Sequence, residues 1–282
     1  MGFEATSLAA PLVVGASLGL AGAALQSTLR NPLAEPYLLG TVGGAALAAS
    51  LAVVAGVGAF GGIAVSLCAF GGSCASLALV CLVAWLASRG KGVWGFPAET
   101  VSLAGFAVGS IAGSAEMVVI SHAPAGTFES VSKWLFGDLS RISPHAFAFA
   151  CAALAVSAIA LYSQNRNLDS LALGDVCARS LGVDVRKTYI VSLGAASLAT
   201  AASVSLAGAI GFVGLITPHA ARRIFGCRHC VYLPASMAGG ALFLFAAQQL
   251  LRFMPEGSNA GIVCALSGGP FFLFLLARRA RR

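Results

Sequence analysis

The chain has 282 residues, of which 58% are hydrophobic and only 10% are charged, with a net charge of +7. An ordinary soluble domain carries about 25% charged residues, so this composition excludes a cytosolic enzyme, a nucleic-acid-binding domain and a disordered chain. The mean hydropathy of +0.89 predicts an all-α polytopic membrane protein, because a backbone that crosses lipid must satisfy its own hydrogen bonds.

We expect about nine transmembrane segments within a single domain, residues 1–282. The segment at 208–221 is short and contains three glycines and a proline, which predicts a half-helix or a re-entrant piece surrounded by protein. The other eight predict full spans, at 8–27, 37–58, 61–87, 100–121, 144–162, 188–207, 231–251 and 260–277.

The basic residues predict the orientation of these spans. Of the 17 Lys and Arg residues, Lys133, Arg141 and Arg252 lie on one side of the predicted membrane and the others lie on the opposite side. Cytoplasmic loops carry the excess of Lys and Arg, so the more basic side is predicted to be cytoplasmic, with the C-terminus there. This distribution requires the 208–221 segment to cross or return to the cytoplasmic side.

Two loops are long enough to fold. The outer loop 122–143 is predicted to form a short interfacial helix. The inner loop 163–187 holds much of the charge outside the spans. We expect two short helices there, broken at Gly174 and Gly182, with Asp175 capping the second.

Three signals for binding chemistry are weak. Gly56, Gly58 and Gly61 spell GxGxxG, but the flanks are apolar and no acidic residue follows at the required distance, so a turn is favoured over a nucleotide site. The stretch 89–92 lacks the phosphate-loop spacing. A lone CxxC at 227–230 favours an ordinary loop over a metal or redox site. We therefore expect no catalytic residue, no metal and no cofactor on this chain.

Two titratable residues remain as candidates. Glu116 lies within a predicted span, where an ionisable group is a functional hypothesis by default. It could line a transport pathway, but its place near the outer end of the helix favours a side chain that reaches the interface. His219 could be a pore group, and a hydrogen bond at a helix terminus is the favoured interpretation.

Small residues predict close helix packing in the first span. Gly15 and Gly19 form a GxxxG pattern, and Gly22 extends the same face. Such residues let helix backbones approach closely in lipid.

Three stretches and the chain's ending together resemble the permease subunits of ATP-binding-cassette (ABC) importers for iron-siderophores, haem and cobalamin, the type II ABC importer family. They are a glycine-rich helix followed by NPLA-P-LG (15–44), LALGDVCARSLGV (171–183), GAIGFVGLITPHAARRIFG (208–226) and the ending GGPFFLFLL (268–276). The residues that match the family's structural motif are Gln26, Asn31, Pro32, Leu33, Ala34, Pro36, Leu39, Gly40, Pro218 and His219.

The resemblance implies a type II ABC importer permease fold of about ten helices in a bacterial cytoplasmic (inner) membrane. It implies a second permease copy, identical or related, a periplasmic or surface-anchored substrate-binding protein, and ABC ATPase subunits that hold the ATP. The loop 163–187 would be the cytoplasmic coupling loop that sits in the ATPase cleft, with Leu171, Leu173 and Leu181 needing a partner to cover them. Its matching residues are Leu171, Leu173, Gly174, Asp175, Ala178, Arg179, Leu181 and Gly182.

The chain departs from the family pattern at its outer face. Compared with that pattern it starts at the second helix, and residues 4–7 stand where docking arginines would be. Arg252 matches the remaining arginine that docks the binding protein, whereas Gln248 stands where an aspartate is common.

The predicted function is the transmembrane subunit of an ATP-driven importer that moves a metal chelate by alternating access, along a pathway of small and apolar side chains. The alternative is a secondary transporter or a non-transporting membrane scaffold, which the altered docking face keeps open. An ion-coupled carrier would be expected to place several charges in the middle of the membrane.

Overall fold

The computed structural model describes residues 2–58, 62–88, 98–123, 125–139, 142–255 and 257–280. Throughout these residues the regular structure is helical, with no strand. Six helices are long and apolar enough to cross a membrane, which confirms the prediction of an all-α polytopic membrane protein. They are α1 (Gly2–Thr28), α3 (Ile63–Ser88), α4 (Ala98–Ser121), α6 (Pro144–Ser163), α9 (Val185–Ala207) and α11 (His229–Leu250).

Two further predicted spans are present as α2 (Thr41–Val54), which has 14 residues, and α12 (Ala260–Ala280), which has 21. Helix α2 is about 21 Å long at 1.5 Å per residue, less than the ~30 Å hydrocarbon core. The predicted span at 37–58 is interrupted because Pro36 starts a separate 3-10 helix, η1 (Pro36–Leu39), and Gly40 follows in the left-handed conformation with φ 72°.

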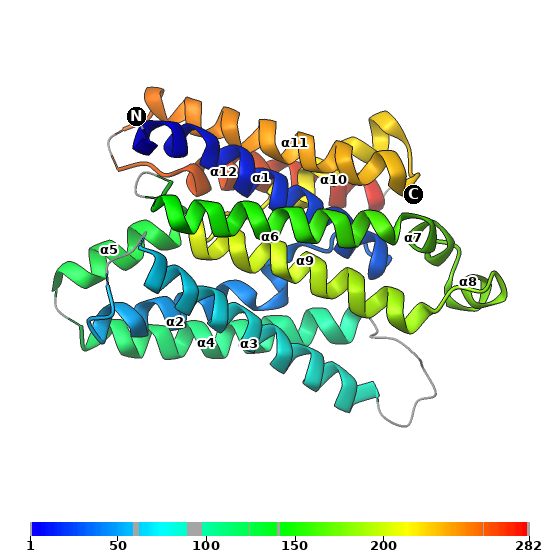
Figure 1. The fold of residues 1–282 in the computed structure, drawn as a ribbon, viewed down its shortest axis with the longest axis horizontal. Coiled ribbons are helices and arrows are strands. Elements are labelled where there is room, and N and C mark those ends of the chain that lie inside the picture. The colour runs from blue at the N-terminus through cyan, green and yellow to red at the C-terminus, as the bar shows by residue number, and fades with distance from the viewer. Residues whose placement is uncertain are drawn as a thin grey trace.

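The predicted half-helix is present as α10 (Val213–Phe225). The 208–212 segment before it is not helical, and Gly208 has a φ of 74° where an added Cβ would overlap the carbonyl of Trp134. Helix α9 ends at Ala207, at the end of the bundle opposite α8 (Asp175–Ser180), and α11 begins near the α8 end (Figure 1). The segment 208–225 returns the chain between these two ends.

Both loop predictions are confirmed in outline. The outer loop contains α5 (Ala125–Leu135), and the inner loop contains α7 (Asn165–Leu171) and α8 (Asp175–Ser180). Gly174 and Gly182 flank α8 with φ values of 107° and 82°, which L side chains rarely adopt. The capping prediction for Asp175 is wrong, because Gly174 is the N-cap and no side chain caps this helix.

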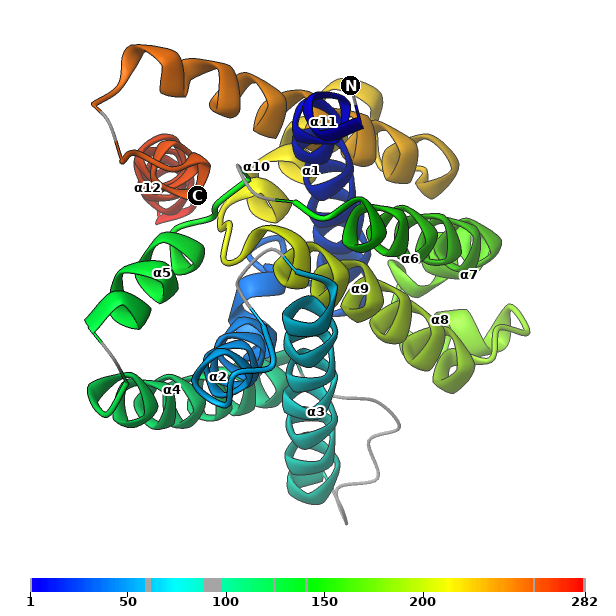
Figure 2. The ribbon, with the colours of Figure 1, turned by 60° about the vertical axis from the view of Figure 1, so that its left-hand side comes forward.

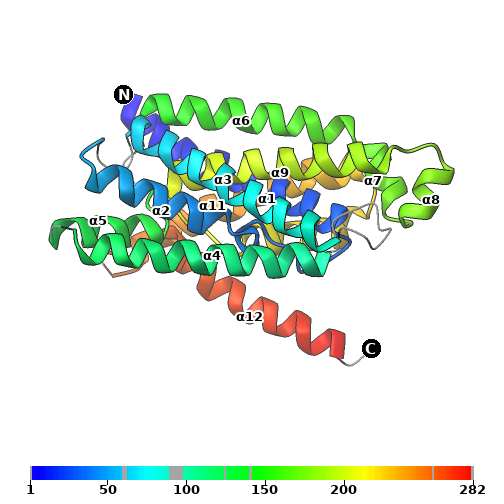
Figure 3. The same ribbon diagram turned by 90° about the horizontal axis from the view of Figure 1, so that it is seen from below.

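Helices α1 and α9 form the centre of the bundle. In each of them 78% of the spanning window is buried, compared with 28–33% in α3, α4, α6 and α11. Figure 2 shows the outer helices arranged around this pair, and Figure 3 places α6 and α12 at opposite edges of the bundle. The central helix α1 contacts α6, α7, α9, α10 and α11.

The predicted glycine face of α1 makes the closest of these contacts. A Cβ added at Gly15 would overlap the carbonyl of Gly240 in α11, and one added at Gly22 would overlap the carbonyl of Gly214 in α10. An added Cβ at Gly19 would meet the carbonyl of Ser236. The backbones touch with no side chain between them, as small-residue packing in membranes predicts.

Most of the described basic residues lie at one end of the bundle. We call the end that holds α7, α8 and the start of α11 the basic end (Figure 1). Lys133 in α5 and Arg252 in the short helix η2 (Leu251–Phe253) lie at the opposite end. Arg89, Lys91, Arg141, Arg281 and Arg282 lie outside the described residues, as does the stretch 89–92. The basic end carries Arg30, Arg166, Arg179, Arg186, Lys187, Arg222, Arg223 and Arg228.

Replacing Gly22 with alanine should lower the free energy of unfolding by about 1–3 kcal/mol, because the added Cβ meets a backbone carbonyl that cannot rotate away. Gly71→Ala in α3 is the matched control, since nothing lies within 4 Å of its added Cβ; it should be neutral or stabilising by up to about 1 kcal/mol. Thermal unfolding in detergent compares the two, and equal midpoints would show that the close approach of α1 is dispensable.

Candidate functional site: the coupling loop and the basic end of helix α1

Helices α7 and α8 protrude from the basic end of the bundle (Figure 1). One side of the loop packs inward, with Leu168, Leu171 and Ala178 fully buried. The other side exposes Leu173, Val176 and Leu181, at 67%, 82% and 60%, which we call the apolar patch.

The prediction that a partner must cover Leu171 is therefore wrong, because its side chain belongs to the protein's own core. Leu173 and Leu181 are exposed as predicted. Of the other predicted loop residues, Arg179 is exposed on α8.

An ion pair joins the loop to α1. Arg30, two residues past the end of α1, lies 2.9 Å from Asp175 at the start of α8. Asp175 thus pairs with the turn that follows α1. At the end of the loop, Asp184 caps α9 by accepting a hydrogen bond from the backbone N–H of Lys187 at 3.0 Å.

Gln26 of the family motif compensates for the backbone hydrogen bond that Pro218 removes from α10. Pro218 has no N–H, so the carbonyl of Gly214, four residues earlier, lacks its normal helical donor. The side-chain amide of Gln26 donates to the carbonyls of Gly214 and Leu215 at 3.2 and 3.4 Å. A buried carbonyl needs such a partner, so Gln26 and Pro218 belong to one arrangement although they are far apart in sequence.

Tyr232 extends this network into α11. Its hydroxyl donates to the side-chain amide oxygen of Gln26 at 3.5 Å and accepts from Arg222 at 3.3 Å. The Arg222 guanidinium also lies 4.9 Å from the centre of the Tyr232 ring. Polar groups of α1, α10 and α11 thus meet at the basic end of the bundle.

The remaining motif residues shape the turn between α1 and α2. The side chain of Asn31 accepts from the backbone N–H of Leu33 at 3.0 Å, a local turn typical of Asn. Pro32 is exposed, and Pro36 begins η1. The carbonyl of Gly40 accepts from Ser76 at 2.7 Å, and an added Cβ at Gly40 would lie 2.7 Å from the carbonyl of Gly105.

Glu35 is a residue of this turn that the sequence did not single out. Its carboxylate accepts a hydrogen bond from the backbone N–H of Phe212, the N-cap of α10. Phe212 has a φ of 68°, a left-handed conformation that a non-glycine residue adopts only when its surroundings hold it. Burial raises the pKa of the Glu35 carboxyl to about 7, against the opposing effect of the Phe212 hydrogen bond. The turn after α1 therefore also holds the start of the half-helix.

The two titratable candidates lie elsewhere. Glu116 does not reach the interface, because its side chain is buried and accepts a hydrogen bond from Ser50 of α2 at 3.0 Å. His219 lies within α10 and not at a helix terminus, and its ring packs edge-on against Phe271 at 5.7 Å. A pathway role for Glu116 and a docking role for Arg252, which is exposed in η2, stay predictions.

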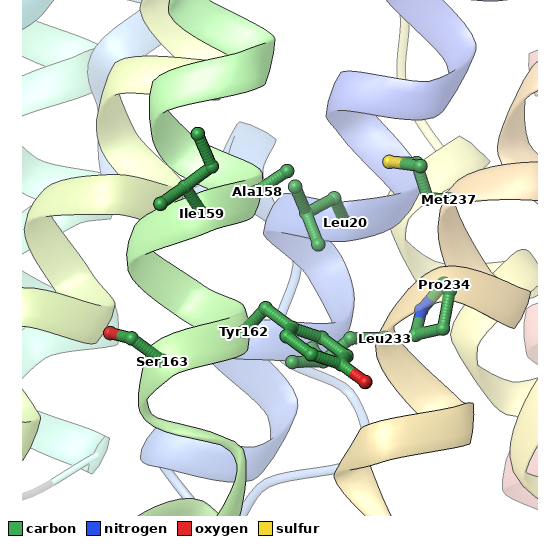
Figure 4. Close-up of a pocket in the computed structure, with 8 residues that line it drawn as sticks. All are labelled: Leu20, Ala158, Ile159, Tyr162, Ser163, Leu233, Pro234 and Met237. Atoms are coloured by element: carbon green, nitrogen blue, oxygen red, sulfur yellow. The ribbon is translucent and has the colours of Figure 1, made fainter.

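An apolar groove of about 480 Å³ opens between α6 and α11 with α1 beneath it. Leu20, Ile159, Leu233 and Met237 are among its lining residues, and Tyr162 and Ser163 supply its side-chain hydroxyls (Figure 4). All eight cysteines, including the CxxC pair, are free thiols. Gly56 of the GxGxxG sequence lies in the turn after α2. In the described parts of the chain, no group of His, Cys, Asp and Glu could hold a metal.

Comparisons with known proteins agree with this geometry. The model of the FecCD transport family matches residues 3–278. The cobalamin import system permease protein BtuC of Halobacterium salinarum is 38% identical, over 95% of this chain and 70% of that protein. The hemin transport system permease protein HmuU of Yersinia pestis is 33% identical, over 95% of this chain and 80% of that protein.

Solved structures show the same fold. One, assigned to the metal-chelate type of ABC transporter and solved in an inward-facing conformation, superposes with a TM-score of 0.84 at 26% identity, covering 98% of this chain and 86% of that one. PsaBC from Streptococcus pneumoniae superposes with a TM-score of 0.66 at 14% identity, covering 97% of this chain and 91% of that one, a likeness of fold alone.

Gln26→Leu should lower the free energy of unfolding by about 1–3 kcal/mol, because it leaves the buried carbonyl of Gly214 unpaired. Pro218→Ala restores the N–H that α10 lacks at this position, so the double variant should recover part of that loss. Denaturation of the two single variants and the double variant measures the coupling. Strictly additive effects would contradict the compensation of Pro218 by Gln26.

Proposed function

The chain belongs to the FecCD transport family, its fold is that of a type II ABC importer permease, and we propose that it is the transmembrane subunit of an ATP-driven importer for a metal chelate. The two relatives described above are named as permeases for cobalamin and hemin, and the chelate class follows from them. The proposed mechanism is alternating access across the cytoplasmic membrane, with hydrolysis by separate ATPase subunits.

The apolar patch is the observation that carries this proposal. Leu173, Val176 and Leu181 are exposed at the end of a membrane protein, on short helices that hold themselves in place through buried residues on their other side. Apolar side chains beyond the membrane need a protein partner to cover them. We assign this surface to the cleft of an ABC ATPase, with the exposed Arg179 beside it.

The positive-inside rule supports a cytoplasmic location for the basic end and for the C-terminus of α12. A substrate-binding protein would dock at the opposite end, where Arg252 is exposed in η2. A second permease subunit, identical or related, would complete the pathway.

The contacts of α1 provide a route for coupling. Closure of two ATPase subunits around ATP would displace α7 and α8. The Arg30–Asp175 ion pair joins α8 to α1, and Gln26 joins α1 to the half-helix α10. Movement at the ATPase surface would thus reach the helices that open and close the pathway.

Reconstitution tests the proposal. Proteoliposomes containing the chain, its ATPase and its binding protein should take up cyanocobalamin or haemin when ATP is supplied on the ATPase side and not with a non-hydrolysable analogue. Uptake that continues without ATP would indicate a secondary transporter. Normal assembly with uptake of neither probe would contradict the proposed chelate class and favour a scaffold.

Val176→Asp should reduce the affinity for the ATPase by at least about tenfold, ~1.4 kcal/mol, because it places a charge in a desolvated contact. Val57→Asp is the matched control: Val57 is 52% exposed in the turn after α2, at the opposite end of the bundle. Co-purification of the ATPase with each variant is the measurement. If both variants lose the co-purifying ATPase equally, or if neither loses it, the apolar patch is not part of the ATPase interface.

A further inference from the structure

A buried histidine connects the coupling loop to two membrane helices. His229 is the first residue of α11, and its ring nitrogen Nδ1 lies 2.6 Å from a carboxylate oxygen of Asp169 in α7. Its other ring nitrogen, Nε2, lies 2.7 Å from the hydroxyl of Ser27 in α1. The side chains come from positions 27, 169 and 229, so only the folded protein brings them together.

Asp169 holds His229 in two ways. The same carboxylate oxygen also accepts the backbone N–H of His229 at 3.0 Å. The N-cap residue of α11, Arg228, has no side-chain cap bond, so Asp169 satisfies a free N–H at this helix start from another element. A carboxylate at a helix N-terminus is also favoured by the helix dipole. Because a carboxylate can only accept, the ring carries its proton on Nδ1.

Ser27 anchors the other side of the ring. It is buried in the last turn of α1, and its hydroxyl lies within hydrogen-bonding distance of both His229 and the carbonyl of Ala23, which is 2.8 Å away. The Ser–His–Asp order resembles that of a hydrolase. A nucleophile must reach a substrate carbonyl, however, whereas this hydroxyl is enclosed between α1 and α11. The arrangement joins elements and performs no chemistry.

We propose that His229 is a positioning residue that ties the coupling helix α7 to α1 and α11, so that the three move together when the ATPase subunits close. This inference rests on the proposed function. A second connection between the loop and the end of α1 is the Arg30–Asp175 ion pair, whose side chains are 41% and 19% exposed, and a partly exposed ion pair contributes little. In the His229–Asp169 pair the side chains are 3% and 40% exposed, and the contact of His229 with Ser27 of α1 is buried on both sides.

The test measures communication between the two ends of the assembled complex without needing the substrate. The complex of this chain with its ATPase is reconstituted, and ATP hydrolysis is measured with and without the substrate-binding protein at the outer face. In His229→Ala, basal hydrolysis and ATPase co-purification should remain, while stimulation by the binding protein should be lost. A residue with only a structural role would lower assembly and basal hydrolysis together.

Partial substitutions assign each side of the ring. Ser27→Ala removes only the α1 contact of His229, and the binding protein should no longer stimulate ATP hydrolysis in this variant, as in His229→Ala. If His229→Ala does not assemble with the ATPase, Ser27→Ala alone tests the proposal. Asp169→Asn keeps an accepting oxygen and should retain most of the stimulation. His145→Ala is the matched control, because His145 is exposed in the first turn of α6 at the opposite end of the bundle.

Full stimulation in both Ser27→Ala and His229→Ala would overturn the proposal. So would parallel loss of assembly, basal hydrolysis and stimulation in Ser27→Ala, which would assign the contacts to stability alone. Failure of the proposed function is distinct: the unmodified chain would then retain no ATPase, or its complex would hydrolyse ATP at a rate independent of the binding protein.

Discussion

Direct backbone contact between α1 and its neighbours is the constraint on which this structure depends. Gly15, Gly19 and Gly22 bring α1 against α11 and α10 so closely that no Cβ fits between them. Lipid provides no hydrophobic force to hold helices together, so packing of this kind has to do so. The same closeness brings Gln26 within reach of the carbonyl that Pro218 leaves unpaired. Helix α1 therefore supplies the partner that the proline in the half-helix α10 requires.

The basic end of α1 and the turn that follows it combine several connections within five residues, 26–30. Gln26 contacts α10, Ser27 contacts His229 of α11, and Arg30 pairs with Asp175 of α8. Each bond alone is worth little in free energy. Together they make α1 the element through which a force applied to α7 and α8 would reach the rest of the bundle. The function proposed above, an importer driven by separate ATPase subunits, requires such a connection.

The sequence predicts most of the fold because lipid imposes long apolar runs, and glycine and proline mark the breaks. The half-helix α10 and the breaks at Gly174 and Gly182 follow from these rules. The tertiary partners could not be predicted. Glu35 and Phe212 are 177 residues apart, and Asp169 gives no local sign that it caps α11. Leu171 looked like its exposed neighbours, and only the packing of α7 shows that it faces inward.

Cys177 offers the most direct measurement of the central claim, that α7 and α8 are the ATPase-binding surface. It is exposed on α8 beside Val176, so a maleimide should label it readily in the detergent-solubilised chain. Residue-resolved mass spectrometry can follow that labelling with and without the bound ATPase, with Val57→Cys as an internal reference at the opposite end. We predict that bound ATPase protects Cys177 and leaves position 57 unchanged. Equal labelling of Cys177 in the free chain and in the complex would contradict the assignment.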